Sequence, residues 1–140
     1  MGTPAKTLDQ LSKVVVGFLA GDRNKGYVSD FSSIDHSFDL LPQEDPLQGM
    51  PTKVEMKDLK AIFFVWEFTG NLEDHHSLSP NAPMQGRGIE VTFSDGEKIV
   101  GRPEEDGSRR IGFFIYPANP KSNNIRIFVI TRNTRHIKFI

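Results

Sequence analysis

Hydrophobic and polar residues alternate along much of the chain with a period of two, which is the pattern of a strand with one buried face. In the segment 89–93, Ile89, Val91 and Phe93 alternate with polar residues. Gly, Pro and Asp interrupt the pattern at short intervals, and the longest apolar run, residues 61–66, is only as long as a strand. We therefore predict short antiparallel strands that are joined by tight turns.

The pattern repeats at an offset of 75 residues. Residues 13–65 align with residues 88–140 without a gap, and ten of the 53 aligned positions are identical, where chance would give about three at ordinary residue frequencies. The identical pairs are Val16/Val91, Phe18/Phe93, Gly21/Gly96, Gly26/Gly101, Ser33/Ser108, Phe38/Phe113, Pro42/Pro117, Val54/Val129, Ile62/Ile137 and Phe64/Phe139. We interpret the chain as a tandem duplication.

Each copy contains five predicted strands. The first two surround a tight turn, which contains Gly21 in the first copy and Gly96 in the second. The second strand of each copy contains a glycine, Gly26 or Gly101, that predicts a bend or bulge. The remaining strands are predicted at 37–41, 53–56 and 60–66, and at 112–116, 125–131 and 135–140.

Five short antiparallel strands with a bent second strand are typical of a small barrel of the SH3-like or Sm-like type. A unit of about fifty residues buries too little surface to be comfortably stable alone, so we expect the copies to pack as a pseudo-dimer. The predicted fold is all-β, with a short N-terminal helical turn indicated by the capping-box spacing of Thr7 and Gln10. The predicted parts are an N-terminal segment 1–12, a first repeat 13–66, a linker 67–87 and a second repeat 88–140.

The composition narrows the classes of protein to consider. The chain has no cysteine, which excludes a disulfide framework and thiolate chemistry. The first residues lack the pattern of a signal peptide, and no apolar run approaches the roughly 20 residues that cross a bilayer. We therefore expect a cytoplasmic protein without a membrane span.

The charge is uneven between the copies. The whole chain has a formal net charge of −1, but residues 13–65 carry 6 basic and 8 acidic side chains, and residues 88–140 carry 9 basic and 6 acidic ones. The basic residues of the second copy are candidate anion-binding residues, because guanidinium groups contact carboxylates and phosphates in a bidentate manner. The candidates are Arg109, Arg110, Lys121, Arg126, Arg132, Arg135 and Lys138.

Two of these candidates, Arg126 and Lys138, fall on the predicted polar faces of their strands. The apolar residues beside them are expected to be buried: Ile125, Ile127, Ile137 and Phe139. If the two polar faces are neighbours, they form one basic patch; otherwise they are ordinary solvated strand faces. Tyr116 and Phe128 could provide aromatic stacking for a nucleic acid, or could pack in the core.

No motif indicates catalysis. The sequence lacks a Gly-x-Ser-x-Gly elbow, a phosphate-binding glycine loop with lysine, a His-Glu-x-x-His pair and a cysteine nucleophile. His75 and His76 are adjacent residues on a predicted loop, and no further ligand cluster accompanies them. We expect no enzymatic activity, no metal site and no cofactor.

The stretch IGFFIYPANPKSNN at 111–124, followed by RIFV at 126–129, resembles a group of bacterial domains that occur in chains with PilZ, response-regulator or secretion-ATPase modules. The resemblance spans both copies and implies a regulatory context, without an activity or a ligand. The PilZ motif for cyclic-di-GMP is Arg-x-x-x-Arg followed by Asp/Asn-x-Ser-x-x-Gly. Asp30 and Ser32 match its second part, but Asp35 replaces the glycine and the arginine arm is absent. The Sm Arg-Gly motif is also absent from the last hairpin.

Two functional hypotheses follow from these observations. The first is a non-catalytic bacterial regulatory or adaptor module that docks a protein partner through its paired barrels. The second is a binder of nucleotide or nucleic acid through the basic face of the second repeat. The sequence leaves the oligomeric state open, because the copies could satisfy each other or extend a sheet into another chain.

Overall fold

The computed structural model describes residues 7–69, 88–104, 111–118 and 121–140. A 3₁₀ turn, η1 (Leu8–Gln10), precedes the strands, and the main-chain N–H of Thr7 donates to the Gln10 side chain at 3.0 Å. The first repeat contains β1 (Ser12–Phe18), β2 (Arg23–Val28), β3 (Ser37–Pro42), β4 (Thr52–Glu55), η2 (Met56–Asp58) and β5 (Leu59–Val65). The second contains β6 (Ile89–Phe93), β7 (Lys98–Pro103), β8 (Gly112–Pro117), β9 (Asn124–Ile130), η4 (Thr131–Asn133) and β10 (Thr134–Phe139).

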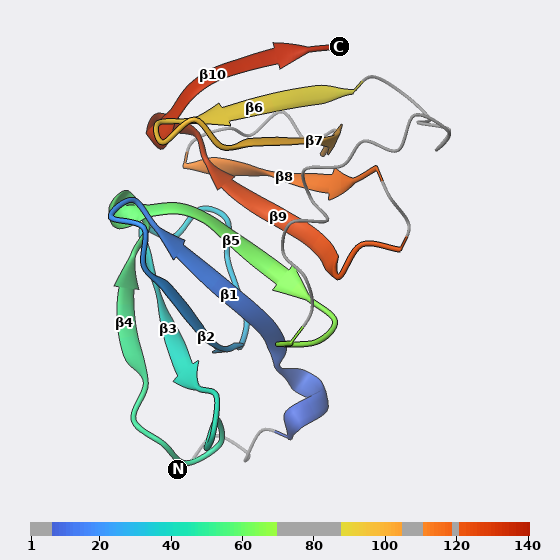
Figure 1. Ribbon diagram of the computed structural model, residues 1–140. Helices are drawn as coiled ribbons and strands as arrows, with labels where there is room; N and C mark the ends of the chain where they lie inside the picture. Colours follow the sequence, from blue (N-terminus) through green and yellow to red (C-terminus); the bar gives the residue numbers. More distant parts are fainter. Residues whose placement is uncertain (1–6, 70–87, 105–110, 119–120) are drawn as a thin grey trace.

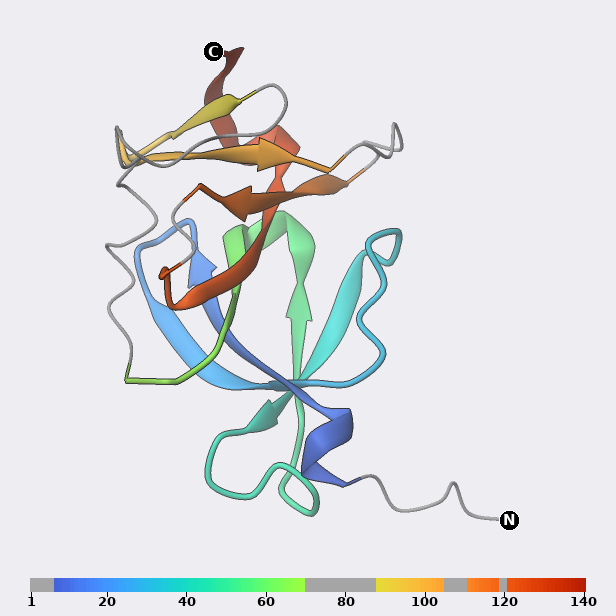
Figure 2. The same cartoon turned by 90° about the vertical axis from the view of Figure 1, so that its right-hand side faces the viewer.

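The all-β prediction is confirmed. Ten antiparallel strands form one sheet in the order β10-β6-β7-β8-β9-β5-β1-β2-β3-β4, which curls into two barrel-like halves that are not closed (Figures 1 and 2). The described residues contain no helix long and apolar enough to cross a bilayer.

Strand pairing reproduces the sequence repeat. Val14 is opposite Gly26 in the first repeat, and Ile89, 75 positions later, is opposite Gly101. Gly26 is in turn opposite Pro42, as Gly101 is opposite Pro117. The duplication that the sequence indicates is therefore a structural one, with the same register in both copies.

The two repeats meet along β5 and β9. Ala61 is opposite Val129 and Phe63 is opposite Ile127 in this ladder, which makes the sheet continuous through both repeats. The join therefore pairs the last strand of the first repeat with the fourth strand of the second (Figure 1).

Two hydrophobic cores lie on opposite faces of the shared strands. Phe64 of β5 packs in the first core and Phe63 packs in the second, so β5 is buried on both faces. The first core contains Val14, Val16, Val28, Leu40, Val54, Met56, Leu59, Ile62, Phe64, Phe114, Phe128 and Ile130. The second contains Val15, Ala61, Phe63, Val65, Ile89, Val91, Phe93, Ile99, Phe113, Ile115, Ile127 and Val129. Each core therefore includes side chains of the other repeat, as expected for a pseudo-dimer.

The side chains that enter the core of the other repeat are apolar, whereas most of their equivalents, 75 positions away in the sequence, are polar. Phe63 of β5 corresponds to Lys138 of β10, and Phe128 of β9 corresponds to Lys53 of β4. The other pairs in this set are Val15/Glu90, Ala61/His136, Phe114/Asp39 and Ile130/Glu55, together with the one apolar exception, Val65/Ile140. The outer edges β4 and β10 thus lack most of the apolar surface that joins the two repeats.

Two predictions of burial were wrong. Ile125 is 39% exposed and Phe139 is 43% exposed. Ile125 lies at a register shift between β5 and β9, where Phe64 is opposite Arg126 but Val65 is opposite Asn124. A bulge of this kind removes one residue from the regular alternation of faces. Phe139 is on the edge strand β10, which among the described strands pairs with β6 alone.

Candidate functional site

The structure places the described basic candidates at separate points of the second repeat. Arg109 and Arg110 lie outside the described residues. Lys121 precedes β9, and Arg126 is on β9. Three strands separate β9 from β10 within the sheet. Arg126 and Lys138 are therefore not on neighbouring strands, which was the condition for a shared basic face.

The cations at the β10 side have protein partners. An Nη atom of Arg135 donates to the Ser94 carbonyl at 2.6 Å, and Lys138 lies 3.7 Å from a carboxylate oxygen of Glu90. Arg132, on η4, lines a cavity of about 180 Å³ between the repeats, together with His36, Glu55, Met56, Lys57, Ile111 and Ile130. This cavity is small, and both signs of charge surround it.

An ion-pair network of four charged residues links the repeats. Lys60 of β5 is 8% exposed and donates to Asp95 at 2.8 Å, and it also pairs with Glu97. Arg23 lies 3.8 Å from Glu97. The hydrogen bond from Lys60 and a second one from the Glu97 N–H hold the pKa of Asp95 below its usual value. The network satisfies a buried lysine, and we interpret it as structural.

A groove of about 470 Å³ lies on the first repeat. It is formed by the residue after η1, the start of the β2–β3 loop, the strand β3 and the loop between β3 and β4. Its lining residues are Leu11, Ser29, Asp30, Asp39, Leu41, Pro46, Leu47 and Gln48. Half of these are apolar, and Leu47 is 49% exposed. The groove therefore combines accessible apolar surface with polar and acidic groups.

The wall of this groove is a tightly folded loop. The Gly49 N–H donates to the Asp45 carbonyl at 2.8 Å. A Cβ atom at Gly49 would lie 2.5 Å from the Pro42 ring and 2.6 Å from the Asp45 carbonyl oxygen. Such close packing requires glycine at this position and holds the loop that carries Leu47 against the end of β3.

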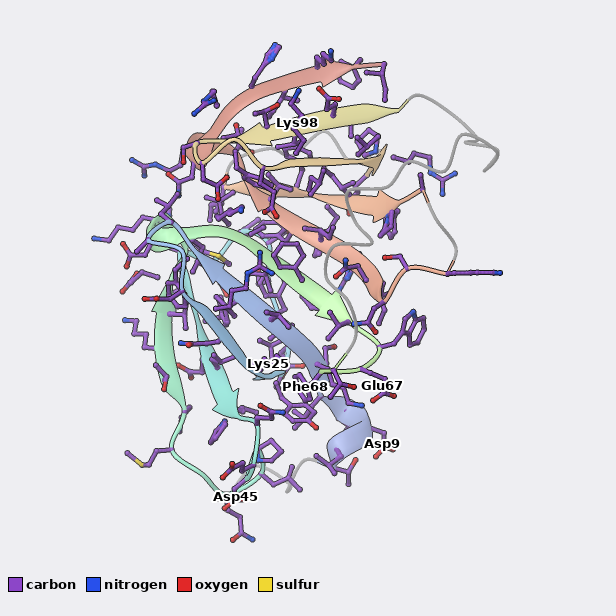
Figure 3. The ribbon with its side chains drawn as sticks, viewed as in Figure 1. Asp9, Lys25, Asp45, Glu67, Phe68 and Lys98 are labelled. Carbon is purple, nitrogen blue, oxygen red and sulfur yellow. The ribbon has the colours of Figure 1, made fainter. Side chains whose placement is uncertain are left out.

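The surroundings of the groove are acidic. Asp30 and Asp39 line it, and no cation of the described part of the chain lies at ion-pair distance from Asp39. Asp9 on η1 and Asp45 on the β3–β4 loop lie at the same end of the molecule (Figure 3). This concentration of carboxylates favours a positively charged ligand over an anion.

Sequence reasoning missed this groove. The sequence predicts no element between the strands at 37–41 and 53–56, because the intervening residues show no regular period. The available signal was the presence of apolar residues in that connection: Leu47 and Met50 are both exposed, at 49% and 87%. Apolar side chains that together form one accessible surface, on a loop held by a rigid scaffold, are typical of docking surfaces.

The comparison with protein families matches residues 10–140 to a family of unknown function, DUF6982. The chain belongs to this family. The DUF6982 match includes both repeats and the junction between them, so the tandem arrangement lies within the extent of the family. No curated protein and no solved structure matches the chain. Function has therefore to be argued from the surfaces themselves.

Proposed function

We propose that this member of DUF6982 is a non-catalytic adaptor module that docks a protein partner, and that the groove of the first repeat is the docking site. The observation that carries the proposal is that three leucines, Leu11, Leu41 and Leu47, line the groove together with Asp39. Peptide segments are bound by rigid surfaces that combine apolar pockets with a few oriented polar groups. The bound segment would carry aliphatic side chains next to a lysine or arginine.

The charge distribution supports a protein ligand over a nucleic acid. Nucleic-acid binding needs a continuous basic surface that follows the phosphate backbone. The described basic residues of the second repeat are separated, and Arg135 and Lys138 contact protein groups. The groove itself is acidic, which disfavours phosphate.

The described residues give little support for a catalytic centre. No three His, Cys, Asp or Glu side chains of the described residues are grouped to hold a metal ion. Asp95 has a lowered pKa, but Lys60 and the Glu97 N–H account for it. A structural ion pair is the simpler explanation of this perturbed group.

Selection from a displayed peptide library with the whole protein tests the proposal. We expect enriched peptides with aliphatic residues beside Lys or Arg, and we expect Leu47→Ser to weaken their binding about tenfold, because a buried leucine contributes roughly 1.5–3 kcal/mol. Leu19→Ser is the matched control, because Leu19 is 43% exposed on the β1–β2 turn, outside the groove. Peptides that bind Leu47→Ser and the unaltered protein equally would overturn the groove assignment.

A further inference from the structure

A second surface lies where β5, β8 and β9 meet, and it differs in charge from the groove. The guanidinium carbon of Arg126 lies 4.0 Å from the ring centre of Phe114 and 4.7 Å from that of Phe64. Phe31 packs edge-on against both rings, with centroid distances of 6.0 and 5.4 Å. Arg126 is thus held over a fixed aromatic surface that both repeats build.

The Arg126 side chain is partly buried, and within the described residues it has no carboxylate partner and no hydrogen-bond acceptor. A desolvated charge without a partner is unfavourable, because the protein interior does not replace its lost hydration. The aromatic rings cover a face of the guanidinium plane and compensate for part of this cost. The N–H groups at its edges are the donors that remain for a ligand.

Two exposed aromatic residues flank Arg126 on the same side of the sheet. Tyr116 is two residues after Phe114 on β8, so alternation places it on the face that carries Phe114 and Arg126. Trp66 is two residues after Phe64, and its main-chain N–H continues the ladder by donating to the Asn123 main-chain carbonyl at 2.9 Å. Trp66 is 61% exposed and Tyr116 is 37% exposed.

The main chain around Trp66 is firmly held. Asn123 accepts from the Glu67 N–H at 3.1 Å and donates to the Glu67 carbonyl at 2.8 Å. Lys25 donates to the Phe68 carbonyl at 2.7 Å, and Phe68 packs on Tyr27. Figure 3 shows Lys25, Glu67 and Phe68 close together at one end of β1 and β2. The exposed indole is therefore presented by an ordered segment, which lowers the entropic cost of binding.

We propose that Arg126, Trp66 and Tyr116 form a binding site for the carboxylate of an acidic peptide segment. The guanidinium N–H groups would donate to the two carboxylate oxygens in the guanidinium plane, and the two aromatic side chains would cover the neighbouring apolar side chains of the peptide. Tryptophan, tyrosine and arginine are the residues that contribute most to protein–protein binding. This site is separate from the groove of the first repeat, and its test does not depend on that groove.

The surroundings favour a carboxylate over a phosphate. Phosphate sites normally combine several cations with main-chain N–H groups or a helix N-terminus. Among the nearby described cations, Lys13 lies 3.4 Å from Glu67 and donates to the Trp66 carbonyl at 3.4 Å. One guanidinium matches the single charge of a carboxylate and its two coplanar oxygens.

Trp66 provides the measurement, because it is the single tryptophan of the chain. Its fluorescence would be followed during titration with three acetylated tripeptides: Leu-Glu-Phe with an amidated end, Leu-Gln-Phe with an amidated end, and Leu-Gln-Phe with a free carboxylate. We expect a saturable change with the first or the third peptide, and binding about tenfold weaker or absent with the second. The first and third peptides distinguish a side-chain carboxylate from a chain terminus.

Arg126→Gln should abolish the preference for the carboxylate peptide, whereas Arg135→Gln, on β10, should leave it unchanged. Circular dichroism would verify that each variant is folded, and the glutamine peptide removes the charge without altering the protein. Equal binding of the charged and amidated neutral peptides, tighter binding of adenosine monophosphate, or no saturable change at millimolar peptide would each overturn the proposal. The groove assignment would survive such a result, because Leu47 is not part of this site.

Discussion

One glycine in each repeat, Gly26 or Gly101, allows two neighbouring strands to approach closely. A Cβ atom at Gly26 would lie 2.4 Å from the Leu41 carbonyl oxygen, and one at Gly101 would lie 2.4 Å from the Tyr116 carbonyl oxygen. Rotation of a side chain cannot relieve a clash with the main chain. We expect Gly26→Ala and Gly101→Ala each to lower the free energy of unfolding by about 1–3 kcal/mol, measured by urea denaturation.

The control for this prediction is Gly17→Ala in β1. A Cβ atom there would lie 3.5 Å from its nearest neighbours, which is an ordinary contact distance. We expect a change within about 0.5 kcal/mol or a slight stabilisation, because alanine has less conformational freedom in the unfolded chain. A loss at Gly17→Ala as large as that at Gly26→Ala would contradict the explanation by close approach.

Asp95 makes stability depend on pH. Its hydrogen bond with Lys60 and that with the Glu97 N–H lower its pKa in the folded chain from the usual 3.8. The unfolded chain therefore binds the proton more readily, so the stabilisation is present above about pH 4 and is lost as the pH falls through the folded pKa. We expect Asp95→Asn to be less stable than the unaltered protein at pH 7, and the difference to shrink at pH 2.5.

Urea midpoints at the two pH values provide the measurement. Asp45→Asn, in the β3–β4 loop, serves as a control in which the carboxylate makes no ion pair with a described residue. If the difference in urea midpoint between Asp95→Asn and the unaltered protein is as large at pH 2.5 as at pH 7, the pairing of Asp95 with Lys60 does not stabilise the fold.

The strand β5 stabilises the fold through side chains on both of its faces. Phe63 is fully buried in the second core, whereas Lys138, at the same position of the second repeat, is exposed on the outer strand β10. We expect Phe63→Ala to lower the free energy of unfolding by about 3–5 kcal/mol, because it leaves a cavity under the second repeat. Lys138→Ala should change it by no more than about 0.5 kcal/mol. Thermal or urea unfolding of both variants measures the difference, and similar losses at the two positions would refute the two-sided role of β5.

Strand positions could be predicted from the sequence because alternation and turn chemistry are local properties. The strand predicted at 37–41 is Ser37–Pro42, and the strand predicted at 60–66 is Leu59–Val65. The apolar run at 61–66 predicted only a strand, and the structure shows that β5, Leu59–Val65, is buried on both faces because the second repeat packs against it.

The candidate sites could not be predicted in the same way, because they depend on contacts between distant segments. Arg126 was identified as a candidate anion ligand, but Phe64 and Phe114 under its guanidinium come from two other strands. The register of β5 against β9 brings these residues together, and no local pattern specifies that register. The groove depends on the folding of the β3–β4 loop onto Pro42, which its composition does not reveal.

The sheet has two different edge strands, β4 and β10. In principle, these edges could pair between two molecules in the way that β9 and β5 pair within one. β4 is the equivalent of β9, and β10 is the equivalent of β5, so β10 of one molecule could pair with β4 of another as β5 pairs with β9. Such a head-to-tail contact does not close on itself and would generate longer assemblies. Lys138 and Lys53 would then occupy the positions of Phe63 and Phe128, where they would be buried without partners in the apolar cores.

We therefore expect the unaltered protein not to associate through these edges, and a variant with junction residues at both ends to do so. The changes are Lys53→Phe and Glu55→Ile on β4, with His136→Ala and Lys138→Phe on β10. Sedimentation velocity over a range of concentrations should show growing assemblies for this variant. The two single-end variants are controls, because a head-to-tail contact needs both apolar edges at once. Two results would contradict this explanation: association of the unaltered protein through β4 and β10, or association of a single-end variant as strong as that of the double-end variant. Either would mean that the charged edge residues do not prevent the sheet from extending into a second molecule.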